Sequence, residues 1–325
     1  MKDKLRTGVV GVGYFGQFHA EKYHQMPGVE LVGLADIDCS RSREMARRFN
    51  TNAFYSYEDL YDKVDAVSIA VPTPIHYQVA KDFFHRGVDV LLEKPITATL
   101  READELIDMA EKKQLVFQVG HQERFNAAFM ALEGILVDPI LIESHRLSPF
   151  LQRAASVDVV LDLMIHDIQI ILSMVDSPIQ SIQAVGVPIV SPYLDIANAR
   201  IEFENGCIAN VTASRVSSEK TRKIRIFQST AHFSIDYVSQ RITVLRKDGK
   251  GRKPIFPGIF VEDIKIAKND PLQLEIKSFV ESVRDRKRPL VSGLDGKKAL
   301  EVALRITDQI QRNIEKRKPL GGLMG

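Results

Sequence analysis

Residues 11–16, Gly-Val-Gly-Tyr-Phe-Gly, constrain the fold more than any other part of the chain because they have the spacing G-x-G-x-x-G. The motif directly follows an apolar run at residues 5–10, which predicts a β-strand. It also begins an amphipathic stretch at residues 14–25, which predicts a helix. A strand, a glycine turn of this kind and a helix are typical of a dinucleotide-binding unit, so we expect a Rossmann domain here.

The three glycines have separate expected roles. Gly11 permits a tight turn, Gly13 lets the backbone approach a pyrophosphate, and Gly16 lets the helix pack closely on the strand. The helix N-terminus offers N–H groups and a partial positive charge to the phosphates. Tyr14 and Phe15 lie in the same loop and are expected to contact the cofactor. A glycine turn in an unrelated sheet is the alternative explanation.

Asp36 follows the second expected strand, residues 30–35, and lies twenty residues beyond Gly16. A carboxylate at this place accepts hydrogen bonds from an adenosine ribose and repels a 2′-phosphate, which favours NAD over NADP. Arg41 and Arg43 are near in sequence and leave use of both cofactors open. On the alternative explanation, Asp36 only caps the next helix.

The pattern of the first 121 residues differs from that of the rest of the chain. Residues 1–121 alternate short β-branched runs with amphipathic stretches, which predicts a doubly wound parallel sheet covered by helices. The further strands are expected at 66–71, 88–92 and 115–119, and the further helices at 40–49, 75–86 and 100–112. Thr99 and Glu102 have capping-box spacing at the start of the last of these helices.

The pattern of residues 122–325 predicts a second, α+β domain with a large, mainly antiparallel sheet. Together with the doubly wound parallel sheet of the first domain, this gives an expected fold class of α/β. Residues 197–204 alternate apolar with polar side chains, Asn205-Gly206 favours a two-residue hairpin turn, and the return strand is expected at 207–214. A largely apolar helix is expected at 157–175. Other strands are expected at 179–187, 223–228, 232–237 and 241–245, a Gly/Lys-rich loop at 247–253, and helices at 272–286 and 294–316.

Composition limits the classes of protein to which the chain can belong. Forty-four basic residues nearly balance 42 acidic ones, and a formal net charge of +2 is too small for a dedicated nucleic-acid binder. No apolar run approaches the roughly 18 residues of a membrane span, and residues near the N-terminus do not resemble a secretion signal. Cys39 and Cys207 form neither a disulfide framework nor a zinc pattern, which indicates the cytoplasm.

Glu93-Lys94-Pro95 follows the expected strand at 88–92 and therefore lies at the carboxyl end of a parallel sheet, where ligands bind. A lysine at that edge can donate a hydrogen bond to a substrate hydroxyl and stabilise a developing alkoxide. Pro95 restricts the local backbone and favours a cis peptide bond more than other residues do. By spacing alone, Lys94 is equally consistent with a solvated loop residue.

Asp162 and His166 lie four residues apart in the apolar segment at 157–175, a spacing that places both side chains on one helical face. Histidine can accept a hydroxyl proton near neutral pH, and a neighbouring carboxylate can orient the substrate. A mutually bonded, structural Asp/His pair is the alternative. Metal coordination is a third interpretation, but no other histidine or cysteine has a helpful spacing, and we expect no metal.

The sequence resembles the glucose-fructose oxidoreductase and myo-inositol dehydrogenase (Gfo/Idh/MocA) family over nearly its whole length. The resemblance is carried by residues 11–16, by 70–74 (Ala-Val-Pro-Thr-Pro) with His76, by Glu93-Lys94-Pro95, and by Asp162 with His166. It implies an NAD-dependent dehydrogenase that oxidises a secondary hydroxyl of a sugar, cyclitol or nucleotide sugar. A homodimer or homotetramer formed through the C-terminal sheet is also implied.

The resemblance further implies roles for individual residues. Lys94 would contact substrate and nicotinamide, Asp162 would orient the substrate, and His166 would be the general base. The residues that would line the cofactor cleft beyond the glycine loop and Asp36 are Pro72, Thr73, Pro74, His76, Glu93, Lys94 and Gln122.

Two other functions remain open on the same fold. One is a non-catalytic regulatory protein that responds to NAD or a sugar, since fold does not determine function; intact Lys94, Asp162 and His166 argue against it. The other is a reductase or a carbon–oxygen lyase that recycles its cofactor, both of which the resemblance allows.

Residues 154–160, Ala-Ala-Ser-Val-Asp-Val-Val, replace a glycine-rich stretch that many family members carry before the Asp/His helix. Substrate preference is therefore expected to differ from those members. Residues 145–147 with 158–167 are similar to bacterial members that oxidise C3 of UDP-N-acetylglucosamine. Four arginines could supply charge for a nucleotide diphosphate, or could serve only structural roles: Arg124, Arg146, Arg153 and Arg215.

Overall fold

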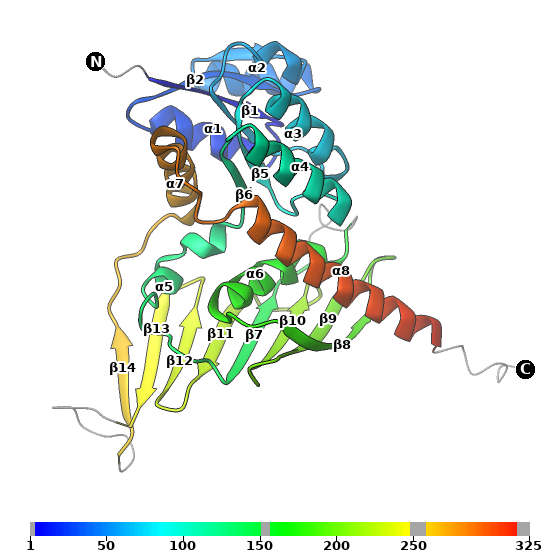
Figure 1. The fold of residues 1–325 in the computed structure, drawn as a ribbon, viewed down its shortest axis with the longest axis vertical. Coiled ribbons are helices and arrows are strands. Elements are labelled where there is room, and N and C mark those ends of the chain that lie inside the picture. The colour runs from blue at the N-terminus through cyan, green and yellow to red at the C-terminus, as the bar shows by residue number, and fades with distance from the viewer. Residues whose placement is uncertain (1–3, 151–156, 248–257, 317–325) are drawn as a thin grey trace, which may run out of the picture. The chain divides into compact units, whose positions relative to one another are not determined.

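The computed structural model describes residues 4–150, 157–247 and 258–316, and the chain divides into two compact units (Figure 1). The first unit comprises Met1–Phe125 and Asp270–Leu300, and the second comprises Asn126–Asn269 and Glu301–Gly325. A bilayer-spanning helix would be long and almost uncharged, and the helices of the described ranges include none of that kind.

The first unit contains a sheet of six parallel strands in the order β3-β2-β1-β4-β5-β6. This is the strand order of a Rossmann fold, so the expected fold class is confirmed. β3 was not expected, because three residues are too few to show a periodic pattern. The strands are β1 (Leu5–Val10), β2 (Val29–Ala35), β3 (Asn52–Phe54), β4 (Ala66–Ile69), β5 (Asp89–Glu93) and β6 (Phe117–Gly120).

Four helices of this unit come from the N-terminal part of the chain and begin close to where sequence predicted. They are α1 (Gly16–Gln25), α2 (Cys39–Arg48), α3 (His76–His85) and α4 (Leu100–Lys112). The capping box of α4 is present, since Thr99 Oγ1 accepts from the Glu102 N–H and the Glu102 carboxylate accepts from the Thr99 N–H. Three short 3₁₀ segments join the elements: η1 (Tyr57–Leu60), η2 (Thr73–Ile75) and η3 (Gln122–Phe125).

Helix α7 (Pro271–Asp285) also belongs to the first unit, although it lies almost 150 residues beyond the rest of that unit in sequence. Its residues Ile276, Phe279, Val280 and Val283 share one buried core with side chains of β1, α1, β2 and α2. Figure 1 shows α7 beside α1. The expected boundary at 121/122 therefore differs from the observed division, because the sheet buries an apolar face against a helix that no local pattern could assign to it.

The second unit contains an eight-stranded sheet in the order β14-β13-β12-β11-β7-β10-β9-β8. Only β7 and β10 pair in parallel among its described strands, so the expectation of a mainly antiparallel sheet is confirmed. The strands are β7 (Leu141–Leu147), β8 (Ile179–Val187), β9 (Ile196–Phe203), β10 (Ile208–Ser214), β11 (Thr221–Phe227), β12 (Ala231–Asp236), β13 (Arg241–Arg246) and β14 (Phe260–Ile264). β7 and β14 were not expected.

The hairpin between β9 and β10 has a three-residue loop, not the two-residue turn that Asn205-Gly206 suggested. Phe203 and Cys207 pair across the loop, with Phe203 N–H donating to Cys207 O at 2.9 Å. The Gly206 N–H donates to Phe203 O at 2.9 Å, and Gly206 has a φ of 85°. This is a turn closed by a glycine in the left-handed region, the next most common way to join two strands.

The helices of the second unit are α5 (Ala127–Met130), α6 (Ile165–Met174) and the C-terminal two thirds of α8 (Gly293–Lys316), whose first third belongs to the first unit. α6 lies on the sheet near β7 and β10 (Figure 1). α8 is fixed to β8, where Asn313 Nδ2 donates to Ala184 O at 3.1 Å. The expected Gly/Lys-rich loop at 247–253 falls almost wholly outside the described residues.

Candidate active site

The glycine loop joins β1 to α1 at the carboxyl edge of the parallel sheet, at the position where strand order reverses between β1 and β4. Gly11 has a φ of 80°, and a Cβ there would lie 2.7 Å from Ala70 O. A Cβ on Gly16 would overlap the Gly11 carbonyl oxygen, whereas a Cβ on Gly13 would meet nothing within 4 Å. Gly11 and Gly16 are therefore required by the packing of the loop, and Gly13 faces open space.

The N-terminus of α1 is suited to a phosphate, because no side chain of the described residues caps it. The residue at the cap position is Phe15, and Phe15 and its neighbour Tyr14 are about half exposed, at 46% and 50%. Their rings meet edge to face, with centroids 5.1 Å apart. The two aromatic side chains thus lie beside the loop and can cover a bound ligand.

Asp36 lies directly after β2 and is nearly buried. Its Oδ2 accepts from the Val12 N–H at 2.9 Å, and its Oδ1 accepts from the Asp38 N–H at 2.8 Å. Arg41 Nη1 lies 3.5 Å from Asp36 Oδ2. The carboxylate therefore fixes the glycine loop and remains at the edge of the sheet, while a separate residue, Asp38, caps α2 by accepting from the N–H groups of Ser40 and Arg41. The alternative that Asp36 is itself the cap is wrong.

The loop after β4 contains Pro72, Thr73 and Pro74, of which the two prolines are exposed and Thr73 is half-buried. His76 lies behind this loop and is only 1% exposed. Its Nδ1 lies 2.8 Å from Pro95 O and its Nε2 lies 2.8 Å from Val71 O. Burial lowers the pKa of His76 although these carbonyls oppose the shift. His76 therefore ties the loop after β4 to the loop after β5.

Glu93-Lys94-Pro95 begins at the last residue of β5, at the same edge of the sheet as Gly11 and Asp36. The Lys94 side chain is half-buried, and the Lys94–Pro95 peptide bond is cis. The Lys94 backbone N–H donates to Glu93 Oε2 at 3.1 Å. The structure thus brings the glycine loop, Asp36, the 72–74 loop and Lys94 to one edge within the first unit.

Gln122 follows β6 at this edge and is half-buried. Sequence reasoning did not single out its neighbour His121, which is buried, and whose pKa is lowered to about 4 by burial and then by the charge on Lys94. It also missed His19 in α1, which contacts Glu93. The spacing of His19, three residues after Gly16, was the available signal, because it places the side chain on the face of α1 that meets the sheet.

In the second unit, Asp162 and His166 lie on consecutive helical segments of different geometry. Val160–Met164 forms a π-helical turn that contains Asp162, and His166 lies in the first turn of α6. Both side chains are half-buried, whereas Met164, Ile165 and Asp167 are buried. The expected helix is thus present, but it has π geometry over this turn, and single π-helical turns of this kind are frequent at functional sites.

Two buried ion pairs anchor this helical segment. Arg146 Nε donates to Asp167 Oδ2 at 2.6 Å, next to His166, with both side chains at most 3% exposed. Arg215 Nε donates to Asp195 Oδ1 at 2.8 Å, and its Nη1 donates to the Val157 carbonyl before the π turn. Asp195 also accepts from the N–H groups of residues 189–191, and burial is outweighed by these bonds and by Arg215, so its pKa is lowered.

The ion pairs correct part of the expectation about arginines. Arg146 and Arg215 are fully engaged inside the second unit, so they do not supply charge for a nucleotide diphosphate. Arg153 lies outside the described residues, and Arg124 is half-buried after β6. Within the ranges that the structure describes, no three His, Cys, Asp or Glu side chains form a group that could hold a metal ion.

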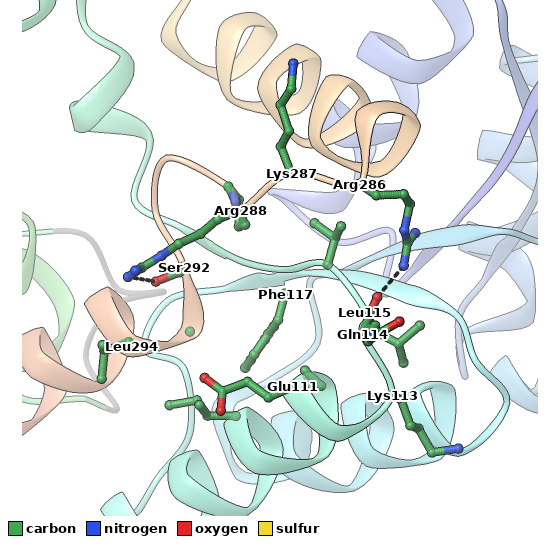
Figure 2. A pocket seen from close by; sticks show the side chains of 15 residues that line it. Glu111, Lys113, Gln114, Leu115, Phe117, Arg286, Lys287, Arg288, Ser292 and Leu294 are labelled. Carbon is green, nitrogen blue, oxygen red and sulfur yellow. Dashed lines mark hydrogen bonds between the residues drawn. The ribbon is translucent and has the colours of Figure 1, made fainter.

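A cavity of about 660 Å³ in the first unit is separate from this edge (Figure 2). It is lined by residues that precede or begin β6 and by the connection from α7 to α8, so it lies where β6 starts. The cations around it are already engaged: Arg286 binds Asp89 and the Gln114 carbonyl, and Arg288 donates to the Ser292 hydroxyl. The cavity therefore does not contain the predicted cofactor residues.

This chain is similar to known protein families and to individual proteins over almost its whole length. The model of an oxidoreductase family with an NAD-binding Rossmann fold (GFO_IDH_MocA) matches residues 5–121, and that of the GFO/IDH/MocA C-terminal domain matches residues 133–234. The UDP-N-acetylglucosamine 3-dehydrogenase of Acidithiobacillus ferrooxidans is 36% identical over 96% of this chain and 99% of its own. A solved structure of that enzyme has a TM-score of 0.89, covering 95% of this chain and 98% of its own.

More distant relatives include the scyllo-inositol 2-dehydrogenase (NAD(+)) of Bacillus subtilis, 26% identical over 97% of this chain and 96% of its own. A levoglucosan dehydrogenase in complex with NADH shares the fold, with a TM-score of 0.85 at 18% identity, over 95% of this chain and 98% of its own.

Proposed function

Because the chain belongs to the Gfo/Idh/MocA family of NAD-binding oxidoreductases, we propose that it oxidises the C3 hydroxyl of UDP-N-acetylglucosamine with NAD. The observation that carries this substrate is the full-length similarity, in sequence and fold, to a UDP-N-acetylglucosamine 3-dehydrogenase. More distant similarity to inositol dehydrogenases supports the coarser statement that the chain is a dehydrogenase acting on CH–OH groups. A purely regulatory role has no such support.

The first unit fits a dinucleotide. The glycine loop leaves open space in front of Gly13, and no side chain of the described residues caps α1, so the backbone can approach a pyrophosphate. Asp36 would accept hydrogen bonds from the adenosine ribose, and Tyr14, Phe15, Pro72, Thr73 and Pro74 would line the cleft. We propose that Glu93, Lys94 and Gln122 border the nicotinamide end and that His76 supports them from behind.

Three side chains would carry the chemistry on the substrate. The Lys94 ammonium would donate a hydrogen bond to the substrate oxygen and stabilise negative charge as it develops there. The Asp162 carboxylate would accept a hydrogen bond from the substrate and fix its orientation. An imidazole nitrogen of His166 would accept the hydroxyl proton. When bound, NAD supplies the acceptor for the hydride that leaves the substrate carbon.

The test of this function is stopped-flow mixing of the NAD-loaded protein with a panel of substrates, read by NADH absorbance. The panel contains UDP-N-acetylglucosamine, UDP-glucose, free N-acetylglucosamine, myo-inositol, scyllo-inositol and levoglucosan. We expect UDP-N-acetylglucosamine to give the highest kcat/KM, by roughly 100-fold over free N-acetylglucosamine, because binding energy from the nucleotide contributes to the rate at the sugar. Faster turnover of an inositol, or no NADH from any compound, would contradict the proposal.

The preference for NAD is tested by Asp36→Asn. The amide keeps an oxygen that can accept from the Val12 N–H but removes the charge that binds a ribose and repels a 2′-phosphate. Loss of a charged hydrogen bond is expected to raise the KM for NAD about 10- to 100-fold. Arg41 loses one of its two carboxylate partners but keeps its ion pair with Asp38 at 3.1 Å, so repulsion of NADP is expected to weaken. Asp38→Ser, which retains a capping side chain on α2, is the matched control and should keep the preference of the unaltered protein. An unchanged ratio of NAD to NADP activity in Asp36→Asn would refute the assignment.

A further inference from the structure

A buried polar cluster lies directly behind Lys94, and its centre is the Glu93 carboxylate. Glu93 Oε2 accepts from the Lys94 backbone N–H at 3.1 Å, and Glu93 Oε1 lies 3.1 Å from His19 Nε2. The Glu93 side chain is 14% exposed and that of His19 is 1% exposed. The carboxylate therefore joins α1 to the backbone of the residue that the proposed reaction uses.

The hydrogen bonds of His19 indicate which of its two ring nitrogens carries the hydrogen. A carboxylate only accepts, so His19 Nε2 carries the hydrogen that faces Glu93. His19 Nδ1 lies 3.1 Å from Ser68 Oγ and can accept from that hydroxyl, while the Tyr23 hydroxyl lies 2.8 Å from Ser68 Oγ and can donate to it. One uncharged form of His19 thus satisfies the whole chain from Tyr23 to Glu93. Burial would raise the pKa of Glu93, but the hydrogen bond from His19 and the positive charge of Lys94 oppose burial, and the pKa is lowered.

Gly120 makes room for this carboxylate. It is the partner of Glu93 across the β5–β6 pair, and a Cβ on Gly120 would lie 3.2 Å from both Glu93 Cδ and Glu93 Oε2. That approach is closer than ordinary side-chain packing allows. The position of the Glu93 carboxylate is therefore set from three sides, by His19, by the Lys94 N–H and by the Gly120 backbone.

The carboxyl group of Glu275, in α7, also belongs to this cluster, but hydrogen bonds do not explain its burial. Its side chain is 0% exposed, and no donor of the described residues reaches either of its carboxyl oxygens. Nearby Gln118 donates through Nε2 to the Glu275 backbone oxygen at 3.0 Å, but in the described part of the chain no donor reaches its own Oε1. A buried carboxylate with no donor is costly, whereas a carboxyl that keeps its proton both avoids the charge and offers an O–H to a neighbouring acceptor.

Several elements bring titratable groups to this cluster, and η3, which packs against α7, carries Glu123 and Arg124. α1 contributes His19 and Tyr23, and the end of β5 contributes Glu93 and Lys94. His76 and His121 interact electrostatically with Glu93. Burial, followed by the charge on Glu93, raises the pKa of Glu275 well above its ordinary range. The missing donors and the raised pKa both favour a Glu275 that keeps its proton beside a charged Glu93.

We propose that His19 is a positioning residue for Lys94 that acts through Glu93: His19 donates to Glu93, the charged carboxylate that fixes the Lys94 backbone, while Glu275 keeps its proton. This inference rests on the proposed function of Lys94. It adds that a buried residue of α1 controls the rate of the reaction without touching substrate or cofactor.

Activity tests the inference first. His19→Leu is expected to lower kcat about 10- to 100-fold while KM for NAD changes little, because displacement of a reacting group costs rate more than binding. His19→Gln is expected to recover most of that loss, since the amide is uncharged and keeps an N–H that can donate to Glu93. Glu275→Leu, which is uncharged as a protonated carboxyl is, is expected to keep the kcat of the unaltered protein. Glu281→Gln, at an exposed position of α7 that pairs with Lys277 at 3.7 Å, is the matched control and should behave as the unaltered protein.

Stability against pH gives a second readout that does not depend on turnover. The pKa of Glu275 is raised in the folded chain, so its contribution to stability is complete below the ordinary glutamic acid pKa of about 4.3 and declines as pH rises towards the raised value. Glu275→Gln removes that decline. The Tm difference between Glu275→Gln and the unaltered protein should be near zero at about pH 4.5 and increase in favour of the variant by about 2–4 °C or more at pH 8. Parallel Tm curves would overturn the uncharged state of Glu275.

Lys94→Met separates this inference from the proposed function. If Lys94→Met turns over UDP-N-acetylglucosamine as fast as the unaltered protein, the proposed role of Lys94 fails. If Lys94→Met is slow but His19→Leu is as fast as the unaltered protein, only the positioning role fails. If His19→Leu does not fold, the smaller His19→Ala decides: the positioning role stands if its kcat is lowered with little change in KM for NAD, and it falls if its kcat is that of the unaltered protein.

Discussion

His166→Ala is expected to lower kcat about 10²- to 10⁴-fold, the range that a general base contributes. Alanine leaves no group that can accept the hydroxyl proton, and Asp162 cannot replace it without losing its orienting role. The dissociation constant for NAD should not change, because the glycine loop and Asp36 belong to the first unit and His166 to the second. The measurements are NADH production at saturating substrate and NAD binding by fluorescence titration.

The control for this variant is His145→Ala. His145 is also a histidine of the second unit, but it lies exposed on β7 and has no place in the proposed chemistry. The pH profile provides an independent criterion, since the fall of kcat on the acid side should disappear in His166→Ala if protonation of this imidazole causes it. Turnover by His166→Ala at the rate of the unaltered protein would show that another group is the base.

Gly16→Ala is expected to abolish useful cofactor binding. The new Cβ would overlap the Gly11 carbonyl oxygen, so either the loop or the start of α1 must move. We expect the dissociation constant for NAD to rise by at least about 100-fold, equivalent to about 2.7 kcal/mol, and the Tm to fall. Isothermal titration with NAD and a thermal melt measure the two effects.

Gly13→Ala separates ligand contact from loop packing. Nothing lies within 4 Å of a Cβ at Gly13, so this variant should melt at the same temperature as the unaltered protein. If a pyrophosphate approaches the backbone there, the added methyl group still weakens NAD binding. Weaker binding in Gly16→Ala with an unchanged affinity in Gly13→Ala would mean that the loop does not hold the dinucleotide as proposed.

Most helices and strands of the first unit could be predicted from sequence because each is marked by residues within the element or directly beside it. The apolar run at β1, the glycine loop, and the Thr99–Glu102 capping box each define an element within a few residues, and α4 begins and ends where expected. Helix α7 was predicted as a helix but not as part of this unit. Its amphipathic pattern shows that Ile276 and Phe279 need an apolar partner, but not which sheet provides it.

The elements that were missed have polar residues where a pattern needs apolar ones. In β7 the inward-facing residues include Ser144 and Arg146, which are both buried. Because both are polar, the sequence does not show the apolar–polar alternation that marks a strand. Arg146 is accommodated at its buried position by the ion pair with Asp167. Glu275 gave no signal, since a glutamate in a surface-like helix is ordinary until its burial is known. Lys94, Asp162 and His166 could be singled out because their motifs are short, whereas their supporting residues are distant in sequence.

The assignment of α7 to the first unit has a consequence for synthesis on the ribosome. When residue 125 has been made, the β-strands and α1 already exist, but the apolar face that contacts Phe279 and Val280 has no cover. At about 5–20 residues per second, the roughly 150 residues that separate that point from α7 take about 7–30 s to translate. During this time the incomplete first unit is expected to expose the hydrophobic surface that α7 later covers, and we expect a chaperone to bind that surface until α7 has been made.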